Sequence, residues 1–569
     1  MKAKILLISL TLTSVIALAQ VSANLDTNNI RAAINANGDL FTGPANHSPA
    51  FEAPKGSFIH TMFTSTMWVA GLDVGGQLHI SCQTYRQAGN DFWPGPLDTL
   101  NGSCSPVVFN SPTWNRVWKI NKTTIDSFRQ YLFNVPPPSI ANWPGNGDPA
   151  YNQAKKLAPF FDVNGDDIYT PANGDYPLIL GDQAVYFIYN DNGGIHTETR
   201  GLTMNLEIHG MAYAYNCNAD SALNNNIFVD YRIINHGTTN FNNVYIGMFT
   251  DFDIGNASDD FVGSDVKRKM YFGYNGSPID GNGGFGYGSN LPAQAVVFLK
   301  GVKADGGDGI DNNQNCIIDE PNETIDFSKF KKHFNAGGVQ GNPFDSLAYY
   351  YNLRARWQND SVLRYGGNGY NTGLPCSYQY PGSSDHQYEF GIGGTCLNPG
   401  PPQASWDEFT AGQFPSDVRG VGSMGPFSMA PGGIYTFHMA YVFGRDYTGG
   451  GPQASINVMN ERVDSIRSYF TNGMTPCGAS LLLSNKEEKM ETTSINVFPN
   501  PANTSITISL PSLEKNAGFE MYDITGKLCL KGRLVKEQNQ IDISKLEEGL
   551  YLLKINNGIT NYSKKVIKL

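Results

Sequence analysis

The chain has 569 residues and a formal net charge of −11, with 16% charged and 12% aromatic residues, 62 glycines and 32 prolines. Its length favours two or more domains, and the low charge with many turn formers indicates β-rich structure instead of long exposed helices. The negative charge disfavours nucleic acid and anionic lipid as partners, because both carry charge of the same sign.

The N-terminal segment 1–23 is typical of a secretory signal peptide. It has two lysines, then an apolar run of about 15 residues, then small residues. Cleavage after Ala19 and cleavage after Ala23 both fit this pattern. No later segment approaches the ~20 apolar residues that a membrane helix needs, so we expect no transmembrane span and a soluble or surface-tethered mature protein.

Residues 24–477, here called the passenger, contain many short stretches in which apolar and polar residues alternate, as in strands. The segment 455–470 differs, because apolar residues spaced by three and four predict a helix with one buried stripe. That stripe consists of Ile456, Met459, Val463, Ile466 and Phe470. The predicted strands cover 57–72, 76–86, 184–189, 202–215, 227–234, 244–252, 295–299 and 434–443. The fold class is therefore all-β: a large β-sandwich passenger, in one or two subdomains, with long loops and one C-terminal helix.

Eight cysteines occur, and an exported protein can oxidise them to disulfides. The pairs nearest in sequence are Cys82 with Cys104 and Cys376 with Cys396. The seven passenger cysteines are an odd number, which predicts at least one free thiol. The pairing itself cannot be read from the sequence.

The segment 160–177 has oxygen-bearing side chains at the first, third and fifth positions of a tight loop, and a backbone carbonyl at the seventh. These positions are Asp162, Asn164, Asp166 and Ile168. The spacing suits calcium, which takes six to eight oxygen ligands, and it resembles the loops of EF-hands and dockerin repeats. Asp167 stands where those loops have glycine and Asn173 where they have a closing glutamate, a role that Asp175 could fill. The alternative is a solvated turn rich in Asp and Asn.

A second acidic loop, 305–320, resembles the repeats of thrombospondin type 3 modules. Its expected calcium ligands are the side chains of Asp311, Asn313 and Asn315, the carbonyl of Ile317, and either Asp319 or Glu320. Cys316 replaces the usual glycine, which either strains the turn or serves a disulfide. Two amides in place of carboxylates predict affinity in the millimolar to sub-millimolar class.

A third cluster follows the predicted strand 244–252 and places five carboxylates within fifteen residues. Four of them are candidate calcium ligands: Asp251, Asp253, Asp259 and Asp260. Carboxylates this close repel each other unless a cation or their spacing relieves them. Asp251 and Asp253 leave the strand on one face, so they either chelate jointly, act as the two acids of a glycoside hydrolase, or form a polar loop. The strand followed by these acids resembles segments of large, uncharacterised secreted proteins, a resemblance that implies no activity.

Other catalytic signals are sparse: the chain has no G-x-S-x-G, H-E-x-x-H or C-x-x-C motif. His196 and Glu198 face the same way on an extended segment, but a structural histidine is the stronger interpretation. Several aromatic residues lie in or beside loops, where they either stack on sugar rings or close the ends of the sandwich. They are Tyr85, Phe92, Trp93, Trp114, Trp118, Trp143, Trp357 and Trp406.

The C-terminal segment 494–569 consists of short predicted strands between turn residues. Its motifs, in order, include Pro499-Asn500-Pro501, Asp523 to Gly526, Gly549 with Tyr551, and a final basic run containing Lys565. The Pro499-Asn500-Pro501 motif sets an entry turn, and the segment from Asp523 to Gly526 is a hairpin turn that needs glycine. The polar residues 478–493 precede this segment as a linker.

This segment resembles the type A C-terminal sorting domain of type IX secretion, a small Ig-like β-sandwich. The resemblance implies recognition by the type IX secretion machinery, removal of the domain on export, and attachment to surface lipopolysaccharide or release. The protein is then expected to be secreted, or attached to the outer cell surface after periplasmic transit.

Together these features predict an exported, calcium-stabilised binding protein for adhesion or for capture of a polysaccharide or surface glycan. A secreted glycan hydrolase and a structural surface component are the alternatives. A hydrolase needs two carboxylates in one open cleft, whereas a binding protein needs exposed aromatic side chains.

Overall fold

The computed structural model describes residues 21–44, 47–87, 89–131, 135–281, 286–481, 496–509, 517–523, 527–536, 538–556 and 561–569. Most of the predicted signal peptide and linker lies outside the described residues. The chain divides into two compact units, Met1–Leu483 and Ser484–Leu569. None of the helices within the described ranges is long and apolar enough to cross a membrane.

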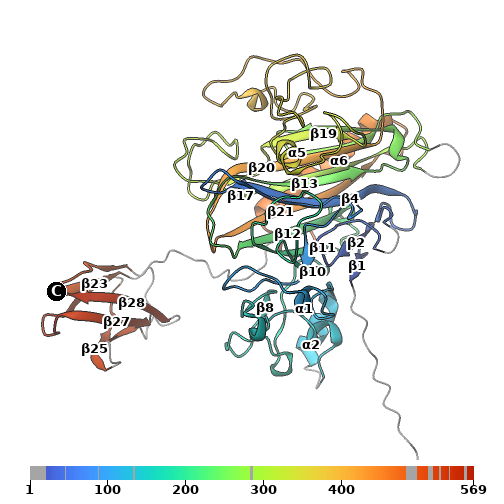
Figure 1. Ribbon diagram of the computed structural model, residues 1–569. Helices are drawn as coiled ribbons and strands as arrows, with labels where there is room; N and C mark the ends of the chain where they lie inside the picture. Colours follow the sequence, from blue (N-terminus) through green and yellow to red (C-terminus); the bar gives the residue numbers. More distant parts are fainter. Residues whose placement is uncertain are drawn as a thin grey trace, which may run out of the picture. The chain divides into compact units, whose positions relative to one another are not determined.

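The first unit contains two large antiparallel sheets (Figure 1). The eight-stranded sheet has the order β1 (Ser22–Leu25), β2 (Arg31–Asn35), β3 (Phe51–Glu52), β4 (His60–Leu72), β13 (Phe241–Phe252), β20 (Val418–Met429) and β19 (Lys329–Phe334), with β5 (Leu78–Cys82) paired to β4. The nine-stranded sheet has the order β14 (Asp260–Asp265), β15 (Met270–Asn275), β16 (Pro292–Lys300), β21 (Ile434–Arg445), β12 (Asn226–Asn235), β11 (Leu206–Ala214), β10 (Gln183–Asn190) and β6 (Trp93–Pro94), with β7 (Trp118–Asn121) paired to β10.

The main hydrophobic core lies between these two sheets, as expected for a sandwich. Met248 of β13 and Met424 of β20 share one buried cluster with Val229 of β12 and Met439 of β21. A hydrogen bond also joins the sheets, with 3.0 Å between the hydroxyl oxygens of Ser65 on β4 and Tyr441 on β21. The predicted all-β sandwich is confirmed.

The outer face of the nine-stranded sheet is covered by α6 (Gly451–Asn472), the predicted C-terminal helix. Ile456, Met459, Val463 and Ile466 are buried on the sheet, and Phe470 is partly buried beside them. Gly444 of β21 permits this close packing, because a Cβ there would lie 2.6 Å from the backbone of Met459. The helix predicted from the spacing of these apolar residues is therefore confirmed, with its apolar side buried against the sheet.

Shorter elements were not predicted. On the outer face of the eight-stranded sheet, α5 (Ser346–Leu353) packs Tyr349 and Leu353 against Trp68 and Phe249. The remaining elements of the first unit are α1 (Pro106–Phe109), α2 (Lys122–Tyr131), α3 (Pro138–Ala141), α4 (Ser221–Asn224), η1 (Pro149–Tyr151), η2 (Pro171–Asn173), η3 (Ala257–Asp259), η4 (Phe390–Ile392), β8 (Phe160–Phe161), β9 (Tyr176–Pro177), β17 (Val302–Lys303) and β18 (Thr324–Ile325).

Two disulfides form, Cys217–Cys477 and Cys316–Cys396. The pairs nearest in sequence do not form, because Cys82, Cys104 and Cys376 are free thiols. Cys82 is buried among the side chains beneath α5, and Cys376 is buried in the main core. Contacts between distant segments therefore decide the pairing, not loop length.

The second unit is a small β domain with a core of its own. Its sheets are β22 (Asn496–Phe498), β23 (Ser505–Ser509) and β26 (Gln538–Asp542), and β25 (Leu528–Arg533), β24 (Gly518–Tyr522), β27 (Gly549–Asn556) and β28 (Asn561–Lys568). Ile506 and Met521 are buried together with Leu553 and Val566. Alternate residues of β27 face this core, which is the expected pattern for a two-layer domain.

Candidate metal centre

Three carboxylates meet where β13 ends and β20 begins. Asp251 is the penultimate residue of β13, Asp253 follows that strand, and Asp417 precedes β20. Each offers one oxygen, and the three oxygens lie within 4.8 Å of one another. Asp251 and Asp253 were predicted to share a face. Asp417 was not predicted, but it joins them because antiparallel pairing sets Asp251 opposite Arg419, two residues after Asp417.

Arg419 and Tyr85 hold this group of carboxylates in place. The guanidinium donates to Asp251 Oδ2 at 3.0 Å through Nη2, to Asp417 through Nη1, and to the Tyr85 hydroxyl at 2.8 Å through Nε. The Tyr85 hydroxyl in turn donates to Asp251 Oδ2 at 2.6 Å. One positive charge therefore faces three carboxylates.

The group remains short of positive charge and of hydrogen-bond donors. Burial raises the pKa of Asp251 well above its usual range, although Arg419 opposes the shift. Burial, followed by the charge of Asp417, raises the pKa of Asp253 to about 7. Asp251 is 2% exposed, and its Oδ1 has no hydrogen-bond partner among the described residues. A divalent cation would satisfy that oxygen and offset the excess negative charge.

Asp259 and Asp260, which were predicted with this cluster, lie outside the group of three carboxylates. Asp260 is buried and its Oδ2 accepts the backbone N–H of Ile254 at 2.9 Å. The carboxylate of Asp259 accepts from the Asn275 amide at 3.1 Å. The chain turns through η3 between Asp253 and Asp259, which separates the two halves of the acidic run.

The predicted calcium loop at 160–177 folds around two carboxylates. Asp162 accepts the backbone N–H groups of Gly165 and Asp167, each at 2.7 Å. Asp175 is buried and accepts those of Val163 at 2.9 Å and Thr170 at 2.7 Å. Asp167 adopts φ 64°, so the left-handed turn forms at the position where glycine was expected.

The side chains between Asp162 and Asp175 form hydrogen bonds within the loop. The amide of Asn164 donates to Asp166 at 2.9 Å, and Asp166 accepts the N–H of Ile168 at 2.8 Å. Within the described ranges, this loop contributes no group of three acidic, histidine or cysteine ligands within 4.8 Å. Asn164 and the Ile168 carbonyl would have to complete any site here.

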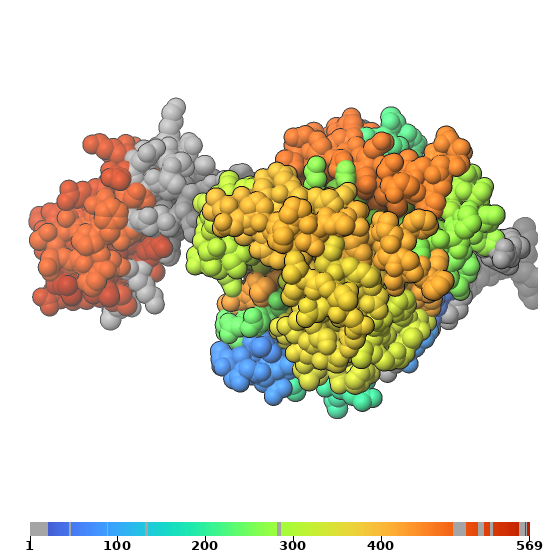
Figure 2. Space-filling view, turned by 90° about the horizontal axis from the view of Figure 1, so that it is seen from above, coloured from blue at the N-terminus to red at the C-terminus, as the bar shows by residue number. Residues whose placement is uncertain are grey.

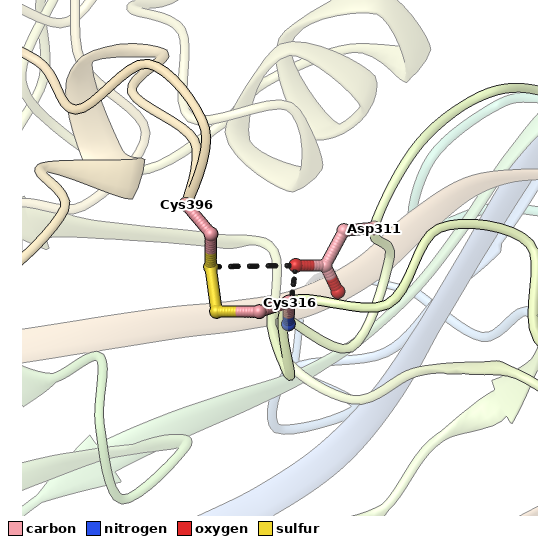
Figure 3. A group of neighbouring side chains, drawn as sticks. All are labelled: Asp311, Cys316 and Cys396. Atoms are coloured by element: carbon pink, nitrogen blue, oxygen red, sulfur yellow. Dashed lines mark hydrogen bonds between the residues drawn. A yellow bond between two sulfur atoms is a disulfide. The ribbon is translucent and has the colours of Figure 1, made fainter.

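The second predicted loop is tied to a distant segment by the Cys316–Cys396 disulfide. Figure 3 shows Asp311 beside it, with Oδ2 accepting the N–H of Cys316 at 2.8 Å and lying 3.9 Å from Cys396 Sγ. The sulfurs are bonded to each other, so they offer no thiolate to a metal. Both roles open for Cys316 are found, because it forms the disulfide and its φ of 74° lies in the left-handed region that favours glycine.

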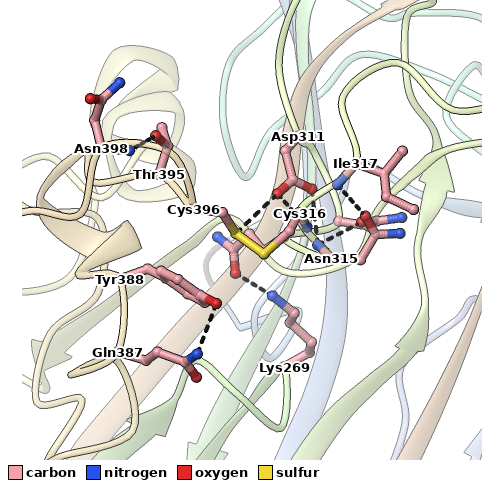
Figure 4. Close-up of a disulfide and its surroundings, with 12 residues drawn as sticks. Lys269, Asp311, Asn315, Cys316, Ile317, Gln387, Tyr388, Thr395, Cys396 and Asn398 are labelled. Carbon is pink, nitrogen blue, oxygen red and sulfur yellow. Dashed lines mark hydrogen bonds between the residues drawn. A yellow bond between two sulfur atoms is a disulfide. The ribbon is translucent and has the colours of Figure 1, made fainter.

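The other predicted ligands of this loop bond to one another, and Figure 4 shows the bond between Asn315 and Ile317 beside the disulfide. The amides of Asn313 and Asn315 both donate to Glu320 Oε1 at 2.6 Å, and the Asn315 side-chain oxygen accepts the N–H of Ile317 at 2.8 Å. Asp319 points elsewhere, since it accepts the N–H of Gly307 at 2.8 Å. Both amide bonds use Oε1 of Glu320, and its Oε2 has no hydrogen-bond partner among the described residues.

The aromatic residues named from the sequence are mostly buried. Six of the eight are buried: Phe92, Trp114, Trp118, Trp143, Trp357 and Trp406. Tyr85 belongs to the carboxylate group, and Trp93 is half-buried. His196 is likewise structural, because its ring nitrogens lie 2.9 Å and 2.6 Å from the backbone oxygens of Ile80 and Asp191.

The C-terminal motifs make the contacts expected of turns. Asn500 accepts the N–H of Ile567 on β28 at 2.9 Å, and Asp523 accepts that of Lys527 at 3.1 Å to close the β24–β25 turn. Tyr551 is buried, with its hydroxyl donating to the Glu547 carbonyl at 2.9 Å. Pro499 and Pro501 flank Asn500, Gly549 begins β27, and Lys565 lies on β28 opposite Leu552. Gly526 lies outside the described residues.

Residues 496–569 match a family model described as a secretion system C-terminal sorting domain. The C-terminal unit is a type IX secretion sorting domain. It marks the protein for export to the cell surface or for secretion, and it implies interaction with the type IX secretion machinery.

Two further comparisons concern the chain as a whole. No curated protein matches the chain. A solved structure titled as a polysaccharide lyase aligns with 69% of this chain and 37% of its own length, at 6% identity and a TM-score of 0.19. A score this low gives no argument about the fold or the activity of the passenger.

Proposed function

We propose that the exported passenger is a calcium-stabilised binding protein that acts at the cell surface in adhesion or polysaccharide capture. The observation that carries the calcium part is the group formed by Asp251, Asp253 and Asp417, with a buried oxygen of Asp251 that has no partner among the described residues. Carboxylate oxygens are the ligands that calcium prefers, and loops 160–177 and 305–320 offer further oxygens of the same kind. Calcium at these three places would fix long connections that have little secondary structure of their own.

The burial and the hydrogen bonds of Asp251 favour a binding protein over a glycan hydrolase. Glycosidases place two carboxyl groups on either side of the scissile bond, about 5–5.5 Å apart in retaining enzymes and 6.5–9.5 Å in inverting ones. Here Asp251 is buried and engaged by Arg419 and Tyr85, so it cannot flank a sugar. A structural surface component remains the second alternative.

The route of export belongs to the same proposal. The sorting domain would leave the passenger after periplasmic transit, and the passenger would then be attached to surface lipopolysaccharide or released. The polar residues 478–493 supply the segment at which the two units would be separated.

The midpoint of thermal unfolding of the passenger should be several degrees higher in the presence of calcium than in the presence of a chelator. Saturating the group at 100 times its dissociation constant would contribute about 2.7 kcal/mol. The measurement is a thermal unfolding scan with calcium, with magnesium and with a chelator. Asp253→Asn combined with Asp417→Asn should remove much of the calcium effect.

Asp259→Asn is the matched control, since Asp259 is near in sequence but lies outside the group of three. It should keep the full calcium effect. Equal unfolding midpoints in calcium and chelator for the unmodified protein would overturn the calcium part of the proposal.

A further inference from the structure

The passenger has an open groove of about 700 Å³ whose lining includes residues of the first turns of α6, β14 and β15, and the segments 380–384 and 405–409. In the view of Figure 2, residues near 380–409 (gold) and residues of α6 (orange) border a hollow. Its volume is within the range of about 300–1,000 Å³ that is usual for ligand pockets. None of the residues of the carboxylate group lines it.

Most polar groups on the groove wall are neutral. Ser277, Ser383, Ser405, Gln453 and Asn457 all line it. Gln453 donates to Asn457 at 3.1 Å, and this leaves the Asn457 amide N–H groups and the Gln453 oxygen without partners among the described residues. The wall therefore offers both donors and acceptors to a ligand rich in hydroxyl groups.

Aromatic side chains line the groove. Phe409 lines the groove and is 77% exposed although it is a large apolar side chain, and it lies two residues after Asp407, which also lines the groove. Phe272 lines the groove too and is half-buried, with its ring centroid 5.7 Å from that of Tyr274. Ring faces of this kind suit the C–H surface of a sugar.

The charges at the groove argue against an anionic ligand. Arg268 is the only cationic side chain among the lining residues, and it is already paired with Asp265 at 2.8 Å and with Asp464 at 2.8 Å. The carboxylate of Asp407 adds negative charge to the lining, because its hydrogen bonds come from the neutral Thr410 and it forms no ion pair among the described residues. An acidic polysaccharide would meet repulsion here, whereas a neutral one would not.

We propose that this groove binds an uncharged oligosaccharide, with Phe409 stacking on a sugar ring and Asn457 and Gln453 bonding its hydroxyl groups. The inference rests on the proposed binding function and names its site and its ligand class. It does not depend on calcium, because the groove and the carboxylate group share no residue.

The test is an array of neutral and uronic-acid-containing oligosaccharides, probed with the full-length mature protein and followed by calorimetry on the best neutral probe. We expect binding to neutral probes and weaker binding to acidic ones. Phe409→Ala should weaken the neutral interaction about tenfold, and Asn457→Ala should weaken it by a similar factor.

Phe414→Ala is the matched control, because Phe414 is 86% exposed, lies five residues further along and does not line the groove. It should bind as the unmodified protein does. If the variant combining Phe409→Ala with Asn457→Ala still bound neutral oligosaccharides, the groove would not be the binding site, but the proposed binding function would stand. Preference for acidic probes would overturn the ligand class, and failure of every probe would overturn glycan capture itself.

Discussion

Lys332→Met should lower the free energy of unfolding of the passenger by about 3–5 kcal/mol, because it leaves the Glu408 carboxylate buried without its counter-charge. Lys332 on β19 and Glu408 form a fully buried ion pair, and Glu408 Oε1 also accepts the N–H of Val262 on β14 at 2.7 Å. Burial lowers the pKa of Lys332 and raises that of Glu408, so each charge depends on the other. Denaturation in urea, followed by tryptophan fluorescence, measures the loss.

The control for this prediction is the double variant Lys332→Met with Glu408→Gln. Glutamine keeps an acceptor for the Val262 N–H and removes the unpaired charge, so most of the lost stability should return. A double variant as unstable as Lys332→Met alone would show that packing, and not the isolated charge, causes the loss.

Removing the Cys217–Cys477 disulfide with Cys217→Ser and Cys477→Ser should lower the free energy of unfolding by about 2–5 kcal/mol. The bond joins residues 260 apart in sequence, and such a long closed loop restricts the unfolded chain strongly. The bond also ties the chain after α6 to the segment after β11. Without it, the helix should separate from the sheet at a lower temperature.

Cys104→Ser is the comparison for the disulfide, because Cys104 is a free, half-buried cysteine. Its effect should stay within about 0.5 kcal/mol. If the double serine variant unfolded at the same urea concentration as Cys104→Ser, the disulfide would not be a stabilising element of the oxidised protein.

Local patterns predicted those parts of the fold that local sequence controls. The predicted strands 184–189 and 227–234 lie within β10 and β12, and the helical stripe at 455–470 lies within α6. The sorting domain was also predicted, because its turn motifs are short and occur in order. These features depend on residues near one another in the chain.

Features that depend on distant partners were missed. β20 has several glycines and a proline, a composition that argues against a strand. Distant side chains explain two of these glycines. A Cβ at Gly422 would lie 2.6 Å from the Tyr271 ring on the other sheet, and one at Gly420 would lie 2.9 Å from the Phe330 ring of β19 and 3.2 Å from that of Tyr271. Asp417 was missed for the same reason, because it reaches Asp251 only through the pairing of β13 with β20.

The most direct test of calcium in the passenger is a count of bound ions by native mass spectrometry of the mature protein after dialysis against calcium. The account predicts bound calcium that a chelator removes, with one ion fewer in Asp253→Asn combined with Asp417→Asn. A mass equal to that of the metal-free protein under the same conditions would contradict it.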